Sequence, residues 1–201
     1  MIVGKLKKVD ISKYGSGNVG TTNSIRVLGL ASGAITFAFD VLKAVAAALV
    51  VFLIFRAIDP GSVRLLTLYA AFGAVLGHDF PFYRGFRGGK GIATSFGLLI
   101  ACLPLTIPIC AAVFFLAVLI RRYISLGSIL ACIALIVQAL VFAPLGLLPF
   151  EGTALYEAVV IACAVGTIGI VKHRSNIGRL LKGTENRFTF HPKNTVKKED
   201  V

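Results

Sequence analysis

Long stretches without charged residues constrain this 201-residue chain more than any other feature. Residues 91–120 and 123–150 contain no Asp, Glu, Lys or Arg, and residues 152–171 contain only Glu157. A bilayer core about 30 Å thick needs about 20 largely apolar residues in a helix, and lipid offers no partner to free backbone groups. The stretches therefore predict an all-α, polytopic integral membrane helix bundle and exclude a secreted, coiled-coil or disordered chain.

Two further apolar segments complete the pattern. Residues 31–55 are interrupted only by Asp40 and Lys43, and residues 65–77 form a shorter segment. Ions inside a membrane are costly and are usually paired, and Asp40 and Lys43 are three residues apart, on one side of a helix. We expect a salt bridge inside the bundle, with a role in proton or ion movement as the alternative.

The stretch 91–120 is too long for a single span. As one helix it would measure about 45 Å at about 1.5 Å per residue. Pro104 and Pro108 lie near its middle, where proline favours a break. Two short helices that turn near Leu103 and Pro104 fit a bilayer better, and six membrane spans are therefore predicted.

Most of the basic residues gather in four patches between these spans. With six spans, all four patches face one side of the membrane, which the positive-inside rule identifies as the cytoplasm. The formal net charge is +12. Because the charges flank apolar runs, a membrane surface or a phosphorylated substrate is favoured over nucleic acid. The patches consist of Lys5, Lys7, Lys8, Lys13 and Arg26; Arg84, Arg87 and Lys90; Arg121 and Arg122; and Lys172, Arg174, Arg179, Lys182, Arg187, Lys193, Lys197 and Lys198.

The four cysteines, Cys102, Cys110, Cys132 and Cys163, all lie in apolar runs. None has a His, Cys or acidic residue at metal-ligand spacing, so we expect them to act as small hydrophobic residues. Neither a metal nor a cofactor is expected.

The first polar segment with a chemical pattern is Gly-Ser-Gly-Asn-Val-Gly-Thr-Thr-Asn at residues 15–23, followed by Arg26. Its three glycines allow backbone N–H groups to converge on an anion, and the Ser, Asn and Thr side chains add donors. A helix that begins soon afterwards would direct its positive N-terminus to the same place. The alternative is an N-capping turn that leads into the first span.

The second polar segment, residues 78–91, is more elaborate than a connection between two helices requires. Its sequence is His-Asp-Phe-Pro-Phe-Tyr-Arg-Gly-Phe-Arg-Gly-Gly-Lys-Gly. The last four residues are typical of a phosphate loop, with Lys90 as a point charge at a helix start. Arg84 stands where a Walker A sequence requires its first glycine, so nucleotide binding is not predicted. The alternative is that the basic residues only fix the topology.

The third polar segment covers residues 173–187. His173 and Asn176 are three residues apart and share one face if the last span continues as a helix. A histidine can exchange a proton or donate to phosphate, although a histidine near a membrane can also be merely interfacial. Ser125 and Ser128, at the start of another span, could cap that span or reach a ligand.

Together the three segments resemble the signature regions of the bacterial acyl-phosphate:glycerol-3-phosphate acyltransferases. Residues 40–44 (Asp-Val-Leu-Lys-Ala) resemble an acidic-basic element of the same family, and the likeness extends from residue 2 to residue 188. The resemblance implies one membrane acyltransferase domain over residues 1–188, followed by a polar tail, 189–201, which we expect to be disordered. It also implies transfer of a fatty acyl group from acyl phosphate to glycerol 3-phosphate. The products would be lysophosphatidate and phosphate, in the first acylation of phospholipid synthesis.

Position by position, the resemblance assigns two groups of binding residues and no metal. The acyl-phosphate headgroup would be held by Ser16, Gly17, Asn18, Gly20, Thr22, Asn23 and Gly89. Glycerol 3-phosphate would be held by Arg26, Lys90, Ser128, His173 and Asn176, and the catalytic residues would be Lys90, His173, Asn176 and Thr22. Acyl phosphate is already activated, so charge neutralisation, orientation and exclusion of water are what the protein must supply. The hydroxyl proton would pass to His173 or, as we favour, to the donor's own phosphate.

Members of this family carry a further N-terminal membrane helix, which makes seven spans, and this sequence opens on residues that resemble only the end of that helix. An inactive truncated paralogue is therefore one alternative. A small membrane transporter or channel is another, because Asp40, Lys43 and Glu157 lie within spans. The resemblance also implies a bacterial inner membrane location, an active site that faces the cytoplasm, and a soluble partner enzyme that produces the acyl phosphate.

Overall fold

The structure, a computed structural model, describes residues 2–188. The polar tail predicted over residues 189–201 lies outside the described residues. Within them the regular structure is helical, as the apolar stretches predict. The helices are α1 (Ile2–Leu6), α2 (Thr21–Leu28), α3 (Leu30–Phe55), α4 (Val63–Asp79), α5 (Ile92–Cys102), α6 (Ile107–Arg121), α7 (Ile124–Phe142), α8 (Gly152–Lys172) and α9 (Arg174–Leu181), and the 3-10 turns are η1 (Ile11–Lys13), η2 (Phe82–Arg84) and η3 (Pro104–Thr106).

Five helical segments of the described chain are long and apolar enough to cross a membrane: α3, α4 extended to Arg84, η3 together with α6, α7 and α8. The sixth apolar helix, α5, has 11 residues. The break expected in the stretch 91–120 is confirmed, because α5 ends at Cys102 and α6 begins at Ile107, after the turn η3. Proline at the start of η3 and again near the start of α6 is tolerated there, since the first turn of a helix has no internal use for the missing N–H group. The count of six spans stays a prediction.

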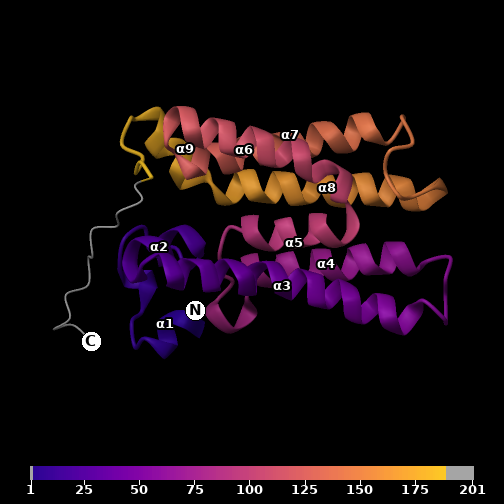
Figure 1. Cartoon of the computed structure of the whole chain (residues 1–201), viewed down its shortest axis with the longest axis horizontal. Coiled ribbons are helices and arrows are strands. Elements are labelled where there is room, and N and C mark those ends of the chain that lie inside the picture. The colour runs from indigo at the N-terminus through magenta and orange to yellow at the C-terminus, as the bar shows by residue number, and fades with distance from the viewer. Residues whose placement is uncertain (1, 189–201) are drawn as a thin grey trace.

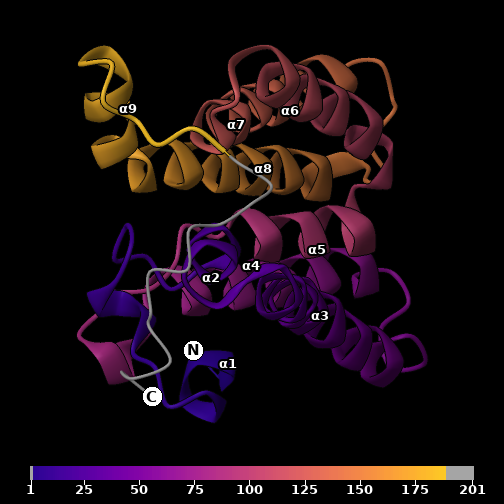
Figure 2. The ribbon, with the colours of Figure 1, turned by 60° about the vertical axis from the view of Figure 1, so that its left-hand side comes forward.

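The long helices pack in two layers (Figures 1 and 2). Helices α3, α4 and α5 form one layer and α6, α7 and α8 the other, with α4 against α8 between them. The core lies where α4, α5, α7 and α8 meet. Its fully buried side chains include Leu68, Ala71, Leu98, Leu135 and Ala158.

Glycines bring neighbouring helices into close contact. A Cβ atom at Gly97 of α5 would overlap the backbone oxygen of Val41 in α3, and one at Gly166 of α8 would crowd the backbone oxygen of Cys132 in α7. Close packing of this kind holds membrane helices together, because lipid gives little hydrophobic drive for their association.

The outer faces of the long helices carry large apolar side chains. Leu53 of α3, Leu119 of α6 and Val160 of α8 are all exposed. Such faces suit contact with lipid hydrocarbon rather than water. The short helices α2 and α9, by contrast, lie together at one end of the bundle (Figure 1), and each carries polar segments identified in the sequence.

Candidate active site

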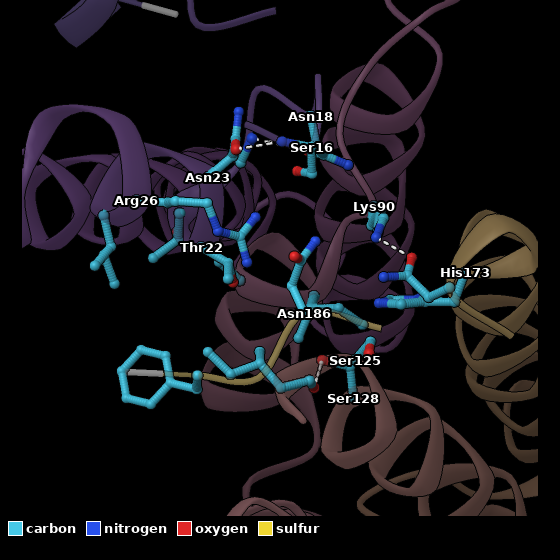
Figure 3. Close-up of a pocket in the computed structure, with 18 of the residues that line it drawn as sticks. Ser16, Asn18, Thr22, Asn23, Arg26, Lys90, Ser125, Ser128, His173 and Asn186 are labelled. Carbon is cyan, nitrogen blue, oxygen red and sulfur yellow. Dashed lines mark hydrogen bonds between the residues drawn. The ribbon is translucent and has the colours of Figure 1, made fainter. Parts of the chain in front are cut away.

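Residues from all three polar segments line one cavity of about 260 Å³ (Figure 3). Two predicted site residues, Gly17 and Gly89, are not among its described lining residues. Those that do line it are Ser16, Asn18, Gly20, Thr22, Asn23, Arg26, Lys90, Ser128, His173 and Asn176. The tertiary structure therefore brings together groups that lie up to 160 positions apart in the chain.

Asn23 shapes the first wall of the cavity. Its amide nitrogen donates to the backbone carbonyls of Ile11 (3.0 Å) and Tyr14 (3.1 Å), and its amide oxygen accepts from the backbone N–H of Ser16 (2.9 Å). The side chain is almost fully buried. Both of its amide hydrogens are thus used by the loop, which makes Asn23 a residue that positions Ser16. Gly15 is required beside it, because a Cβ there would overlap the Asn23 amide.

The N-terminus of α2 opens into the same cavity. Gly20 precedes the helix, and no side chain caps the first turn. The Asn18 side chain accepts instead from the Gly20 N–H (2.8 Å), which folds the loop back on itself. Backbone N–H groups at the start of a helix attract anions, and both Thr22 and Arg26 of α2 line the cavity beside them. Gly20 is the N-cap residue, so the segment does form an N-capping turn, and binding of an anion by this turn stays a prediction.

The second wall is the loop that leads into α5. The N–H groups of Gly88 and Gly89 donate to the carbonyls of Asp79 and His78, both at 3.2 Å. A Cβ atom at Gly89 would overlap the His78 imidazole, so glycine is needed there for close packing. Gly89 therefore holds the loop against α4, and the next residue, Lys90, reaches the cavity.

Lys90 joins the second and third segments. Its ammonium donates to the side-chain oxygen of Asn176 (Figure 3). Burial lowers the pKa of Lys90 to about 8, opposed by the charge of Glu185 and assisted by those of Arg179 and Arg26. A cation held in a partly dry cavity interacts strongly with a phosphate.

His173 lies at the junction between α8 and α9, where the helix is interrupted. Its Nδ1 lies 2.7 Å from the carbonyl oxygen of Gly169. A carbonyl can only accept, so Nδ1 carries the proton and Nε2 of the neutral ring has a free lone pair. Burial, together with the nearby Lys90 charge, lowers the pKa of His173 to about 4. The ring is therefore neutral near pH 7 and can accept a hydrogen bond from a hydroxyl group.

Glu185 lies in the third wall of the cavity, which is formed by α7, α9 and the segment after α9. From the sequence, no role was predicted for this residue. It accepts hydrogen bonds from Ser125 (2.9 Å), Asn176 (2.8 Å) and Arg179 (2.7 Å). Burial opposes ionisation of the carboxyl group, but these hydrogen bonds outweigh it and keep the pKa of Glu185 below its usual value. Through these three hydrogen bonds Glu185 links the start of α7 to α9. In the sequence, the only available signal was an acidic residue inside a basic segment.

The two serines of α7 do not cap that helix, whose first turn has no side-chain cap. Ser125 bonds to Glu185, and Ser128 donates to the backbone oxygen of Ile124 (2.9 Å) while still facing the cavity. The serine hydroxyl of residue 128 keeps its oxygen lone pairs available to a ligand.

The predicted ion pair between Asp40 and Lys43 is confirmed. Lys43 Nζ lies 2.5 Å from Asp40 Oδ1 and 3.0 Å from His78 Nδ1. His78 completes this cluster at the end of α4. Asp40 and His78 form part of the cavity wall, whereas Lys43 is not among its described lining residues.

Apolar side chains from four helices also line the cavity. Phe37 of α3, Ile92 of α5, Phe114 of α6 and Ile124 of α7 line it. Such a lining suits a hydrocarbon chain that enters between the helices, while the polar groups hold a charged headgroup. Within residues 2–188, no three His, Cys, Asp or Glu side chains come close enough to hold a metal ion.

The sequence of residues 1–183 matches the family model of glycerol-3-phosphate acyltransferase. The chain belongs to this family. The glycerol-3-phosphate acyltransferase of Shouchella clausii is 40% identical over 187 residues, which cover 93% of this chain and 86% of the relative. That of Chlorobaculum tepidum is 38% identical and covers 96% of this chain and 91% of the relative.

Two solved structures show the same fold. One is the glycerol 3-phosphate form of PlsY (YgiH), an integral membrane glycerol 3-phosphate acyltransferase, with a TM-score of 0.76 and 34% identity over 94% of this chain and 86% of that one. The other is the lysophosphatidic acid form of PlsY, with a TM-score of 0.73 and 33% identity over 94% and 87%. The chain is accordingly an all-helical, multi-pass membrane protein of an acyltransferase family, and the transporter alternative is set aside.

Proposed function

We propose that this protein transfers a fatty acyl group from acyl phosphate to a hydroxyl group of glycerol 3-phosphate. The observation that carries the proposal is one cavity that combines two cations, Arg26 and Lys90, and an uncapped helix N-terminus with an apolar wall. Acyl phosphate has a phosphate head and a hydrocarbon tail, and glycerol 3-phosphate brings a second phosphate. The relatives named above act on, or were solved with, glycerol 3-phosphate.

Two phosphates can be held in separate parts of the cavity. The N-terminus of α2, with Ser16, Asn18 and Thr22, is proposed to bind the acyl-phosphate headgroup. Arg26 and Ser128 are proposed to bind glycerol 3-phosphate, together with His173 and Asn176. Lys90, whose ammonium already lies against Asn176, is proposed to neutralise charge on both phosphates, which lowers their mutual repulsion.

The chemical step is an attack of the glycerol hydroxyl oxygen on the acyl carbonyl carbon. A C–O ester bond forms, the bond between the acyl carbon and the phosphate oxygen breaks, and phosphate leaves with the electron pair. The lone pair on Nε2 of His173 orients the hydroxyl by accepting its hydrogen bond. Because the pKa of His173 is only about 4, the ring is a weak base, and the departing phosphate is proposed to receive the proton.

The proposed location follows from the basic segments. The multi-pass membrane character comes from the apolar helices and the PlsY likeness. We place the membrane as the bacterial inner membrane and the cavity on its cytoplasmic side, where Lys and Arg accumulate. A soluble enzyme that makes acyl phosphate would then deliver the donor from the same side.

Purified protein in lipid nanodiscs, supplied with palmitoyl phosphate and radiolabelled glycerol 3-phosphate, should form lysophosphatidate and release phosphate in equal amounts. Lys90→Ala should lower the rate by about 10²–10³, as expected for one lost charge-stabilising contact in a dry site. Arg121→Ala is the matched control, because this exposed arginine lies outside the cavity lining.

Three results would contradict parts of the proposal. Product formation from palmitoyl-coenzyme A but not from palmitoyl phosphate would refute the donor. Absence of product with either donor would refute the activity and favour the inactive paralogue. Near-normal turnover in Lys90→Ala would refute the role given to Lys90.

A further inference from the structure

A second cavity of about 450 Å³ lies on the other side of the Asp40–His78 wall. It is lined by α3, α4, the loop that follows α4, which includes Gly89, by Val3 of α1 and by Val19 of the loop before α2. Asp40 and His78 line both cavities. The second cavity therefore shares a wall with the candidate active site, but nothing in the proposed reaction uses it.

The charged residues of this lining are two basic ones and one acidic one. Lys43 and Arg84 both face the second cavity. Among its described lining residues the only acid is Asp40, which is already paired with Lys43. An ammonium group has three donors, and for Lys43 the neighbouring groups at hydrogen-bond distance are Asp40 and His78. The Lys43 side chain is still 39% exposed, so a further donor is available to an anion.

The remaining walls are largely apolar. Val3, Val19, Phe39, Ala74 and Pro81 line the cavity, and such surfaces bind hydrocarbon rather than a hydrated inorganic ion.

The cavity also borders the lipid-facing side of α3. Phe39 is 51% exposed, and the neighbouring Leu42 is 57% exposed. Outward-facing apolar side chains on a membrane helix face lipid, so a hydrocarbon tail can extend from the cavity along α3 into the bilayer. Lys43 meets His78 at the end of α4, where a headgroup would lie.

We propose that the second cavity is a binding site for an anionic amphiphile, namely a phosphate headgroup attached to a fatty acyl tail. Lys43 binds the phosphate, and the Phe39 side of the cavity holds the first part of the tail. Two sources share this chemistry: lysophosphatidate, which as a product rests on the proposed function, and a diacyl anionic phospholipid of the bilayer, which does not.

A ligand bound in the second cavity would change contacts in the candidate active site. Lys43 also holds Asp40, and His78 packs against Gly89, whose neighbour Lys90 lines the first cavity. An anion that draws the ammonium away from Asp40 changes the partners of a residue common to both cavities. The site is therefore placed to regulate turnover by membrane composition or by product.

The test uses the fact that the chain contains no tryptophan. A Phe39→Trp variant gives a single fluorophore at the rim of the second cavity, and Phe115→Trp, on the exposed face of α6, reports ordinary contact with lipid. Both are placed in phosphatidylcholine nanodiscs and titrated with three lipids that carry brominated acyl chains: lysophosphatidate, phosphatidylglycerol and phosphatidylcholine. Saturating glycerol 3-phosphate is added in a parallel series.

We expect saturable quenching of Phe39→Trp by an anionic lipid, with little effect of glycerol 3-phosphate, and only gradual, non-saturating quenching of Phe115→Trp. In the Phe39→Trp background, Lys43→Gln should weaken binding at least about tenfold, since a charged hydrogen bond is lost. Ala74→Leu, which fills the cavity without changing its charge, should weaken lipid binding as well. This second variant tests the site independently if Lys43→Gln fails to fold. Saturation by lysophosphatidate alone would assign the product as ligand, and saturation by phosphatidylglycerol would assign bilayer lipid.

The proposal is overturned if phosphatidylcholine quenches as strongly as the anionic lipids, or if neither Lys43→Gln nor Ala74→Leu changes the titration. It is also overturned if glycerol 3-phosphate abolishes the quenching, because the lipid would then occupy the first cavity. Binding is measured without turnover, so a failure of the acyl-transfer assay leaves this result intact, and the reverse is equally true.

Discussion

Lys90 is the residue on which the electrostatics of the candidate site depend. Burial brings its pKa to about 8, whereas an exposed lysine titrates near 10.4. The same residue contacts Asn176 of the third polar segment. Its charge can therefore change within an ordinary range of pH.

This charge predicts an alkaline limb in the pH profile. Below pH 8 Lys90 is protonated and can neutralise the substrate phosphates; as pH rises through about 8 it loses its proton, and kcat/KM should fall tenfold per pH unit. Both substrate phosphates are already fully ionised above pH 7, so they do not produce the decline. The measurement is kcat/KM from pH 5 to pH 10 in the wild-type protein.

Lys90→Arg is the matched variant for this profile. Arginine stays charged throughout this range, so the variant should be slower but should lose the limb near pH 8. A limb that persists unchanged in Lys90→Arg would show that another group titrates there. His173, with a pKa of about 4, should add no limb above pH 5.

At the scale of elements, the loop before α2 depends on one buried side chain. Asn23 makes hydrogen bonds to Ile11, Tyr14 and Ser16, and these bonds join the turn η1 to the first turn of α2. The loop otherwise has little packing of its own apart from a small cluster around Ile11 and Val27. The turn proposed to bind an anion is thus held in place by the Asn23 amide together with this small cluster.

Asn23→Ala should therefore destabilise this element. The carbonyls of Ile11 and Tyr14 lose their partner, at a cost of about 1–3 kcal/mol. In detergent we expect earlier proteolysis of the segment before α2 and a lower Tm, together with a raised KM for acyl phosphate. Ser12→Ala is the control, since its hydrogen bonds to Asp10 are exposed and the change should be within about 0.5 kcal/mol. Equal protease resistance of Asn23→Ala and the wild-type protein would show that the loop does not need the amide.

At the scale of the whole molecule, the six-span topology predicts which residues face each side of the membrane. Single cysteines are introduced into a variant in which the four native cysteines are replaced by alanine, at exposed positions at the two ends of the bundle. With six spans, Arg87→Cys and Lys182→Cys should react with a membrane-impermeant maleimide only from the cytoplasmic side. Ile58→Cys and Leu145→Cys should react only from the opposite side. Reaction of Arg87→Cys and Lys182→Cys from different sides would refute the six-span topology.

Many features of the fold were accessible from the sequence for a physical reason. Hydropathy is a property of each residue, so apolar stretches and the proline break near Leu103 could be located without knowing any contact. The i, i+3 spacing of Asp40 and Lys43 is likewise local, and it predicted their ion pair correctly. The short amphipathic helix α2 was anticipated only as a helix start after the glycine-rich segment.

Contacts between side chains from different segments of the site could not be predicted from such local patterns. Lys90 and Asn176 are 86 positions apart, and their contact depends on how α5 and α9 are placed by the packing of the bundle. The same applies to Glu185, which appeared as one acid among basic residues and proved to link α7 to α9. Asn23 and Gly89 were assigned to the ligand, yet the structure uses the side chain of one and the small size of the other to hold loops.

Composition and spacing thus identified a membrane-embedded helical protein and its three polar segments, because burial in lipid and glycine-rich turns both require particular residue types at neighbouring positions. Which of those residues meet a substrate, and which support the ones that do, was decided by the packed bundle. Two cavities on either side of Asp40 and His78 exist only once α3 and α4 lie together. Contacts between distant segments are set by the packing of whole helices, and no local pattern encodes that packing.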